Sequence, residues 1–178
     1  MELWDLYTKD RIKTGQTMVR GDAMPEDLYH IIVHACVFNK KGEMLIQQRQ
    51  PFKQGWSNLW DITMGGSATA GDTSQTAVER ELREELGLEL SFEGIRPTLT
   101  VHLDEGFDDF YLVECDVDLS ALKLQYEEVQ AVKWAGHDEI IQMIEEGIFI
   151  PYHKSSIDLL FYMKDHRGLH TCGDPTAK

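Results

Sequence analysis

The most constraining feature of the sequence is the segment Gly65–Leu88, where two glycines and a polar loop lead into an acidic, helix-forming pattern. The helix is predicted to begin near Asp72 or Thr73, with Asp72 and Gln75 resembling a capping box, and to end at Gly87. Its apolar positions recur at helical spacing and are Val78, Leu82 and Leu86. Because such a stripe is buried against another layer, the segment requires a folded core around it.

The carboxylates of this helix are crowded. Glu81, Glu84 and Glu85 stand at positions i, i+3 and i+4, within an arc of about 100°. Like charges at this spacing destabilise a helix by roughly 0.2–0.5 kcal/mol per pair, so the acids are either a solvated face or ligands that a cation neutralises. Oxygen donors with no His or Cys nearby favour Mg²⁺ or Mn²⁺, and the preceding glycines let a backbone carbonyl approach such an ion. Arg80 lies one turn before Glu84 and can pair with it.

The charge balance limits the partners of the chain. It contains 17 Lys and Arg against 31 Asp and Glu residues, a formal net charge of −14. Passive binding to nucleic acid or to an anionic membrane needs clustered cations, whereas a small anionic ligand can be held through a bound divalent cation. No apolar run approaches the ~18 residues of a membrane span, and the three cysteines are widely spaced. We therefore expect a cytoplasmic protein without a membrane or long nucleic-acid partner, and assembly as a homodimer stays open.

The organisation of the chain predicts one domain over residues 1–178, with an N-terminal hairpin extension at 1–25 and a frayed tail at 169–178. Predicted strands cover 28–38, 44–49, 98–103, 110–117 and 132–134, and the first two form a hairpin around the turn Asn39–Gly42. Further helices are predicted over 138–146 and 155–164. Strands interleaved with a few helices predict a mixed-sheet α/β or α+β domain.

The glycine–carboxylate segment resembles the Nudix box, G-x5-E-x7-R-E-U-x-E-E-x-G-U, where U is apolar. Gly66 matches the first glycine, and Arg80–Leu88 matches the second half completely. The one departure is Asp72, which stands where the pattern has Glu. The resemblance implies an α/β/α sandwich around a mixed sheet. It also implies hydrolysis of a diphosphate linkage in a nucleoside diphosphate–X type or other small diphosphate substrate.

The resemblance also implies roles for individual residues. The set that would hold Mg²⁺ or Mn²⁺ comprises Gly65, Gly66, Glu81, Glu84 and Glu85. Arg80 would orient Glu84 or Glu85. Asp72 stands at a position that usually pairs with another residue of the box, and its side chain is one methylene shorter than the usual Glu. The first choice for a general base is Glu81 or Glu85. The second choice for the general base is a loop acid, Glu127 or Glu128. The alternative for these two residues is a solvated turn.

Other residues are candidates for substrate contacts. Arg49, Lys53 and Arg20 are expected phosphate contacts, although each alone is also typical of a surface charge. The aromatic residues Phe52, Trp56 and Trp60 can stack on a nucleobase or pack within the loop and core. The predicted substrate set is Arg49, Lys53, Trp60 and Glu128. His30 and His34 fall on one strand face, as half-buried or substrate-facing side chains or, alternatively, as transition-metal ligands.

Within the family, the chain is similar to the branch that contains isopentenyl-diphosphate isomerase. The shared features are the N-terminal hairpin, His30, the Asn39–Gly42 turn and the Trp-containing loop. At the positions where that isomerase has its catalytic Cys and a His, this chain has Gly65 and Ser67, so isomerase activity is not expected. Asp108 and Asp109 are extra ligands or a polar turn. A non-catalytic Nudix module for ligand sensing is a further alternative, against which the intact glutamate set argues.

Overall fold

The computed structural model describes residues 2–166 and 168, and its sheet is built on the strand β3 (His30–Phe38). Side chains alternate between the two faces of a strand, and β3 is apolar along one face, whereas the other carries His30 and His34 before its apolar end. One face contributes Ile31, Val33, Ala35 and Val37 to a first hydrophobic core. The other contributes Cys36 and Phe38 to a second core. The alternation along this single strand therefore separates two layers of packing.

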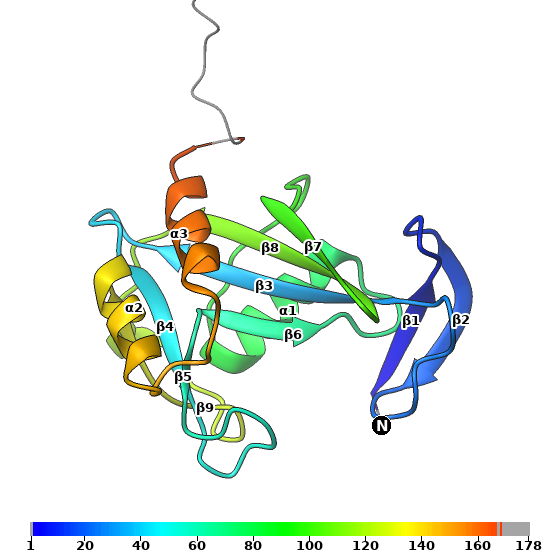
Figure 1. Ribbon diagram of the computed structural model, residues 1–178, viewed down its shortest axis with the longest axis horizontal. Coiled ribbons are helices and arrows are strands. Elements are labelled where there is room, and N and C mark those ends of the chain that lie inside the picture. The colour runs from blue at the N-terminus through cyan, green and yellow to red at the C-terminus, as the bar shows by residue number, and fades with distance from the viewer. Residues whose placement is uncertain (1, 167, 169–178) are drawn as a thin grey trace, which may run out of the picture.

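The main sheet is mixed (Figure 1). Its strand order is β5 (Trp60–Asp61), β4 (Met44–Arg49), β3, β8 (Gly106–Glu114) and β7 (Leu99–Leu103). In addition, β6 (Met64–Ser67) pairs with β3, and β9 (Val129–Ala135) pairs with β4. The β3–β8 pair is parallel along its whole length, and the other pairs are antiparallel. The predicted hairpin of the first two sheet strands is reduced to one partner pair, Phe38 with Met44, because β6 pairs with Ile32–Ala35 on the same edge of β3, opposite the edge that β8 occupies.

Three helices cover the two faces of the sheet. The first core receives α1 (Ser74–Leu86) through its predicted apolar stripe, and Gly87 ends this helix in the left-handed conformation with φ 65°. The second core receives α2 (His137–Glu145) and α3 (Lys154–Met163), which bury Ile140, Met143, Ile157 and Leu160. Burying such a side chain contributes about 1.5–3 kcal/mol. The predicted mixed-sheet sandwich with helices on both faces is confirmed.

The N-terminal hairpin is a separate two-stranded sheet, seen at the right of Figure 1. It consists of β1 (Leu3–Tyr7) and β2 (Lys13–Val19), within the residues 1–25 where a hairpin is predicted, and its turn covers residues 8–12. Arg11, in its turn, pairs with Asp109 of β8, whose side chain is fully buried. Asp109 also accepts hydrogen bonds from Ser74 Oγ at 2.5 Å and Thr100 Oγ1 at 2.6 Å. The hairpin is thus fastened to the sheet and to α1 through one buried carboxylate.

Several details differ from the predictions. The capping box of α1 is formed by Thr73 and Thr76, not by Asp72 and Gln75, because the carboxylate of Asp72 is taken by other donors. The acids Asp108 and Asp109 lie inside β8, so they form no polar turn. The predicted tail at 169–178 lies outside the described residues. No helix in the described part of the chain has the length and apolar character needed to cross a bilayer.

Candidate active site

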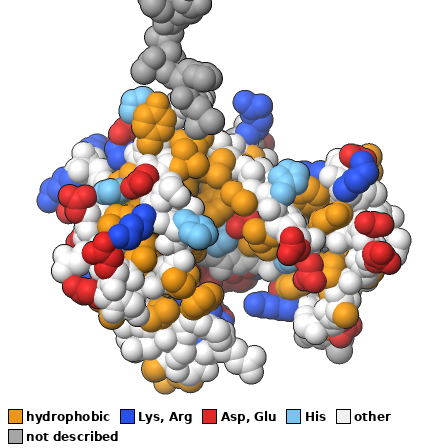
Figure 2. All heavy atoms as spheres, viewed as in Figure 1, with side chains coloured by type: hydrophobic (Ala, Val, Ile, Leu, Met, Phe, Trp, Pro, Cys, Tyr) orange, Lys and Arg blue, Asp and Glu red, His pale blue; other side chains and the backbone are white. Residues whose placement is uncertain are grey.

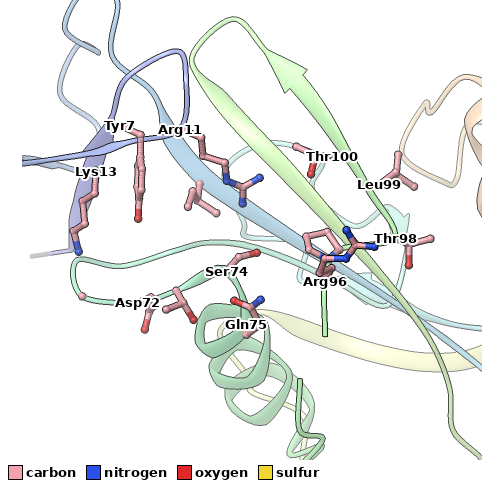
Figure 3. Close-up of a pocket in the computed structure, with 14 residues that line it drawn as sticks. Tyr7, Arg11, Lys13, Asp72, Ser74, Gln75, Arg96, Thr98, Leu99 and Thr100 are labelled. Carbon is pink, nitrogen blue, oxygen red and sulfur yellow. The ribbon is translucent and has the colours of Figure 1, made fainter. Parts of the chain in front are cut away.

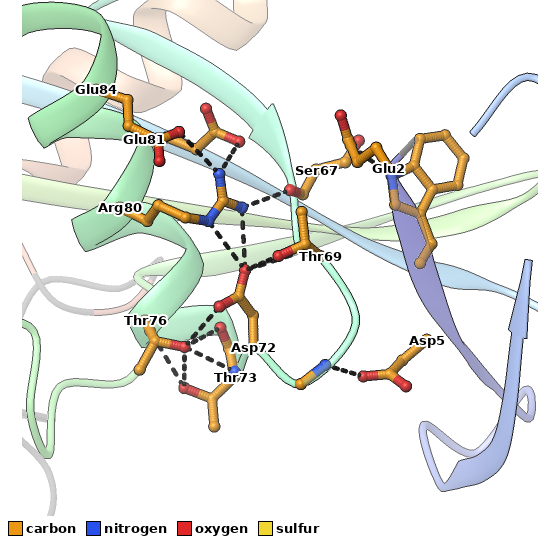
Figure 4. A network of polar contacts seen from close by, with 12 residues as sticks. Glu2, Asp5, Ser67, Thr69, Asp72, Thr73, Thr76, Arg80, Glu81 and Glu84 are labelled. Carbon is orange, nitrogen blue, oxygen red and sulfur yellow. Dashed lines mark hydrogen bonds and ion pairs between the residues drawn. The ribbon is translucent and has the colours of Figure 1, made fainter. Parts of the chain in front are cut away.

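Arg80 is the organising side chain of the predicted site (Figure 4). Its Nη1 donates to Glu81 Oε1 at 2.9 Å and to Glu84 Oε2 at 3.2 Å. Its Nη2 donates to Asp72 Oδ2 at 3.0 Å and to the carbonyl oxygen of Ser67 at 3.1 Å. Burial alone lowers the pKa of Arg80, but the charges of Glu81 and Asp72 outweigh it and keep the guanidinium protonated. Arg80 therefore orients Glu81 and Glu84, and the shorter Asp72 still reaches it.

Two glycines of β6 allow close approach from opposite faces of the sheet. A Cβ at Gly66 would stand 2.5 Å from the carboxyl carbon of Glu81, and a Cβ at Gly65 would stand 2.5 Å from His34 Nε2. Both distances are far below any normal contact. Glycine is therefore required at both positions, because the Glu81 carboxyl on one face and the His34 imidazole on the other lie directly against this backbone.

The three box glutamates have different surroundings. The Glu81 and Glu84 side chains are 16% and 48% exposed. Glu85 is buried and accepts a hydrogen bond from Gln47 Nε2 at 3.1 Å. Burial, and next the charge of Glu81, raise the pKa of Glu85 to about 8, and burial also raises the pKa of Glu81 despite Arg80. These two carboxylates lack enough positive charge around them.

This donor set fits a hard divalent cation in its chemistry. The groups that meet here are carboxylate and backbone oxygens, the ligands that Mg²⁺ and Mn²⁺ prefer, and a cation would relieve the repulsion between Glu81 and Glu85. Among residues 2–166 and 168, however, no three His, Cys, Asp or Glu side chains already converge as a metal cluster. The guanidinium of Arg80 lies between Glu81 and Glu84 instead. Holding a metal would therefore require these carboxylates to turn.

A cavity of about 370 Å³ adjoins the glycine pair. It lies between the end of the hairpin and the loop that precedes β5, and Figure 2 shows the corresponding notch between the hairpin and the rest of the molecule. The polar side chains that line it are Arg20, His34, Arg49, Asp61, Ser67 and Tyr152, and the remaining lining residues are Ile32, Trp56, Gly65, Gly66 and Ile150. Its size is within the range of small-molecule sites.

Two buried polar pairs stand in this cavity. His34 Nδ1 lies 2.6 Å from Asp108 Oδ1. Burial lowers the pKa of His34, but the hydrogen bond to Asp108 and the nearby carboxylates outweigh burial, so the pKa is raised. Tyr152 Oη donates to Asp61 Oδ1 at 2.9 Å, and burial raises the pKa of Asp61. Asp108 contacts His34 on the cavity side of the sheet without lining the cavity itself, whereas its neighbour Asp109 faces Arg11 on the other side. The two acids are thus not a joint ligand pair.

The predicted substrate residues are divided by the structure. Arg49 lines the cavity, as does Arg20. Lys53 and Glu128 form an ion pair with each other and are absent from the lining. Trp60 also lies outside it and carries Lys133 Nζ 5.0 Å from its ring centroid.

The loop aromatics and His30 follow the same division. Trp56 lines the cavity, whereas Phe52 pairs with Tyr126 at 5.7 Å between ring centroids. His30 stacks on Trp4 of the hairpin at 4.0 Å. The residue that sequence interpretation missed is Asp61, whose only signal is an acid directly before the short strand-like run Ile62–Met64.

A second cavity, of about 710 Å³, lies on the other side of the hairpin, against the start of α1 (Figure 3). Its lining includes the cations Arg11, Lys13 and Arg96. Arg11 is paired with Asp109, and Lys13 Nζ lies 2.5 Å from Asp5 Oδ2. It shares no lining residue with the cavity beside the glycine pair, and neither lining includes a box glutamate. Of the two cavities, only the first is lined by Gly65 and Gly66, so the second is not the predicted site.

Known proteins resemble this chain over most of its length. A family model of the NUDIX domain matches residues 28–154. A Nudix hydrolase of Listeria monocytogenes, described as uncharacterized, is 42% identical over 170 residues, which cover 96% of this chain and 99% of that protein. An isopentenyl-diphosphate Delta-isomerase of Shigella flexneri is 27% identical over 150 residues, 79% of this chain and 80% of that one. The crystal structure of DR0079 from Deinococcus radiodurans has a TM-score of 0.70 at 22% identity, and covers 91% of this chain and 99% of its own. With the box residues gathered around Gly66 in a mixed-sheet sandwich, the chain belongs to the Nudix domain family.

Proposed function

We propose that the protein is a Mg²⁺- or Mn²⁺-dependent hydrolase that cleaves a diphosphate linkage in a nucleoside diphosphate–X type or other small diphosphate substrate. The observation that carries the proposal is the approach of the Glu81 carboxyl to the Gly66 backbone, beside the buried Glu85. Glu81, Glu84, Glu85 and a carbonyl of Gly65 or Gly66 are the proposed metal ligands. A bound divalent ion supplies charge neutralisation of the diphosphate and a water of lowered pKa.

The side chains have distinct roles in this proposal. Arg80 binds one oxygen each of Glu81 and Glu84 and so orients both side chains, which turn about this contact to share a metal. Glu81 or Glu85 takes the proton of the attacking water: Glu81 lies against the Gly66 backbone with its side chain 16% exposed, and Glu85 is buried. Glu128 is the weaker candidate for the base because it is already paired with Lys53. Arg49 and Arg20, on the cavity wall, are placed to contact phosphate oxygens.

Similarity to an isopentenyl-diphosphate isomerase makes isomerase-like chemistry the second candidate. The contact between Gly65 and His34 argues against it, because any side chain at position 65 would meet the imidazole. Neither cysteine of the described residues supplies the missing catalytic thiol: Cys36 is fully buried in the second core and Cys115 packs against the first. Burial raises the pKa of the Cys36 thiol far above neutrality.

The proposal is tested by hydrolysis of a panel of nucleoside diphosphate derivatives and alkyl diphosphates with Mg²⁺ or Mn²⁺, followed by detection of released phosphate or nucleotide. We expect turnover of at least one compound, loss of turnover with a chelator, and recovery on adding metal. The double variant Glu84→Gln, Glu85→Gln should lose activity by at least about 100-fold and keep the wild-type circular dichroism spectrum.

The matched control is Glu89→Gln with Glu93→Gln, which removes the same charge at exposed positions of the chain and should leave turnover unchanged. Full activity in the Glu84/Glu85 variant would show that the metal ligands are assigned wrongly. Tight binding of one compound by wild type without any cleavage would favour a non-catalytic Nudix module. Cytoplasmic location, a small-molecule partner and the assembly state stay predictions.

A further inference from the structure

The loop between β4 and β5 holds one bulky residue in an unfavourable backbone conformation. Gly55, Trp56 and Asn58 have φ values of 72°, 48° and 62°. Glycine and asparagine tolerate the left-handed region, whereas a bulky side chain there is a genuine outlier. Strain of this kind persists only where the surroundings impose it, and it concentrates at binding sites.

Hydrogen bonds around Trp56 fix the backbone and leave its indole unused. Ser57 Oγ donates to the carbonyl oxygen of Pro51 at 2.5 Å, and Leu59 N donates to that of Trp56 at 3.3 Å. Gln48 Nε2 donates to the carbonyl oxygen of Asn58 at 3.1 Å. None of these bonds involves the Trp56 side chain, so the loop presents the indole without enclosing it.

Trp56 lines the cavity beside the glycine pair. Trp56 is 54% exposed and belongs to the cavity lining. Within residues 2–166 and 168, no other aromatic ring pairs with it, whereas Phe52 of the same loop, 56% exposed, pairs with Tyr126 away from the cavity. An exposed aromatic face at a cavity wall gains most when a flat ligand group stacks on it.

Arginines on two walls of the same cavity suit a phosphorylated ligand. Arg20 comes from the end of the hairpin and is held by Glu2 at 2.9 Å. Arg49 comes from the end of β4, and its Nε is buried without a hydrogen-bond partner in the described structure. A buried, unmatched donor is costly, and a phosphate oxygen is its natural acceptor.

The remaining lining distinguishes a nucleoside from an alkyl chain. An isoprenoid chain binds in a cavity with mostly aliphatic walls, but in the lining of this cavity only Ile32 and Ile150 have aliphatic side chains. The polar pairs His34–Asp108 and Tyr152–Asp61 offer donors and acceptors of the kind that ribose hydroxyls and base edges use. The cavity is therefore better matched to a flat, polar group than to a hydrocarbon tail.

We infer that Trp56 is a specificity-determining residue that stacks on the nucleobase of a nucleoside diphosphate substrate, with Arg49 and Arg20 on its phosphates. The inference rests on the proposed function, because the nucleoside that stacks on Trp56 is part of the diphosphate substrate proposed for this site. Trp56 takes no part in the chemical step. Its contribution is to affinity for substrates that carry a planar base.

Steady-state kinetics of Trp56→Ala, Trp56→Phe and Trp56→Leu test the inference, with Phe52→Ala as the matched control for an exposed aromatic of the same loop. On the best nucleoside diphosphate derivative, Trp56→Ala should raise KM by roughly 5- to 100-fold at nearly constant kcat. Trp56→Phe should recover most of the loss, whereas Trp56→Leu, which is apolar but not flat, should not. KM for an alkyl diphosphate should stay the same in all variants, and Phe52→Ala should behave as wild type.

A binding measurement separates this inference from the proposed function. ADP and GDP, titrated without metal, should quench the tryptophan fluorescence of wild type and of the Glu84→Gln, Glu85→Gln variant, and the quenching should be lost in Trp56→Phe. Quenching that depends on Trp56 without turnover of any substrate would overturn the hydrolase and leave the stacking residue standing. An equal rise of KM for alkyl and nucleoside substrates, or full recovery by Trp56→Leu, would overturn the stacking role.

Discussion

At the scale of single residues, the absence of a side chain at Gly66 is as important as the presence of the glutamates. Gly66 has no left-handed backbone, so its identity is not dictated by φ. It is dictated by the Glu81 carboxyl, whose Oε1 would lie 2.6 Å from a Cβ at this position. A glycine in the Nudix box thus makes room for an acid of the same box.

We predict that Gly66→Ala displaces Glu81 and lowers kcat on the best substrate by at least about 10-fold, a change in barrier of about 1.4 kcal/mol. The urea midpoint should fall only slightly, because Glu81 lies near solvent and can turn outward. Gly136→Ala is the control, since a Cβ there meets nothing within 4 Å. Unchanged kcat in Gly66→Ala would mean that the position of Glu81 does not matter for turnover.

At the scale of elements, His137 joins two helices of the second layer. It is the first residue of α2, and its Nδ1 and Nε2 lie 2.8 Å from Asp138 and 2.7 Å from Asp158 of α3. Hydrogen bonds to Asp138 and Asp158 raise the pKa of His137. The charged imidazole is therefore favoured by folding, and its stabilising effect is present below the unfolded value, about 6.5, and lost as pH rises through the folded value.

This linkage predicts a difference in pH dependence rather than a large loss of stability. The free energy of unfolding of wild type minus that of His137→Gln should be greatest at or below about pH 6.5 and should shrink as the pH rises. Urea unfolding at a series of pH values measures it, and subtraction cancels the groups common to both proteins. Asp158→Asn should reduce the same difference. A gap that stays constant with pH would show that His137 contributes only packing, for example against Phe161.

The elements themselves were accessible from the sequence, because long runs of one periodicity dominate them. The helix bounds agree to within one or two residues, and the strand 44–49 matches β4 fully. Short elements were not: β5 and β6 have 2 and 4 residues and lie in a glycine-rich stretch without periodicity. The parallel pairing of β3 with β8 was also beyond reach, since no local pattern encodes partners so distant in sequence.

The site was predictable where one helix carries it. The pairing of Arg80 with Glu84 follows from their i, i+4 spacing on the helix. The contact of Arg80 with Glu81 joins adjacent residues, which helix geometry does not bring face to face, and the sequence did not predict it. The cavity wall is assembled from separate elements, and the sequence therefore did not identify Asp61 or distinguish Trp56 from Trp60. Adjacent acids also went unresolved, because only the strand assignment sends Asp108 and Asp109 to opposite faces.

At the scale of the whole molecule, the hairpin depends on the charge of Arg11. We predict that Arg11→Ala lowers the free energy of unfolding by about 2–3 kcal/mol, because it leaves the fully buried Asp109 without its counter-charge. The expected loss is below that of a completely buried pair, since Arg11 is 34% exposed and Asp109 keeps its two hydroxyl donors. Urea unfolding measures the change.

Lys9→Ala is the control for Arg11→Ala in the same turn, since its ion pair with Asp10 is largely exposed and is worth at most about 1 kcal/mol. Adding Asp109→Asn to Arg11→Ala should recover part of the loss, as coupled partners do in a double-mutant cycle. If the single Arg11 variant is as stable as the Lys9 variant, the hairpin is held by its other contacts, such as the backbone pairing of Tyr7 with Tyr29.

The parallel pairing of β3 with β8 has a consequence for folding of the chain during its synthesis. β3 is synthesised early and is largely apolar, yet its full-length neighbour ends only at Glu114. Until the ribosome has added that strand, β3 has an open edge that can pair with other chains, and such long-range pairing is intrinsically slow. α1 lies between β3 and β8 in the sequence and is therefore synthesised before β8. The nascent chain thus carries this acidic helix together with the open edge of β3. Production of this protein is therefore expected to be limited by chain association during synthesis rather than by the stability of the finished fold.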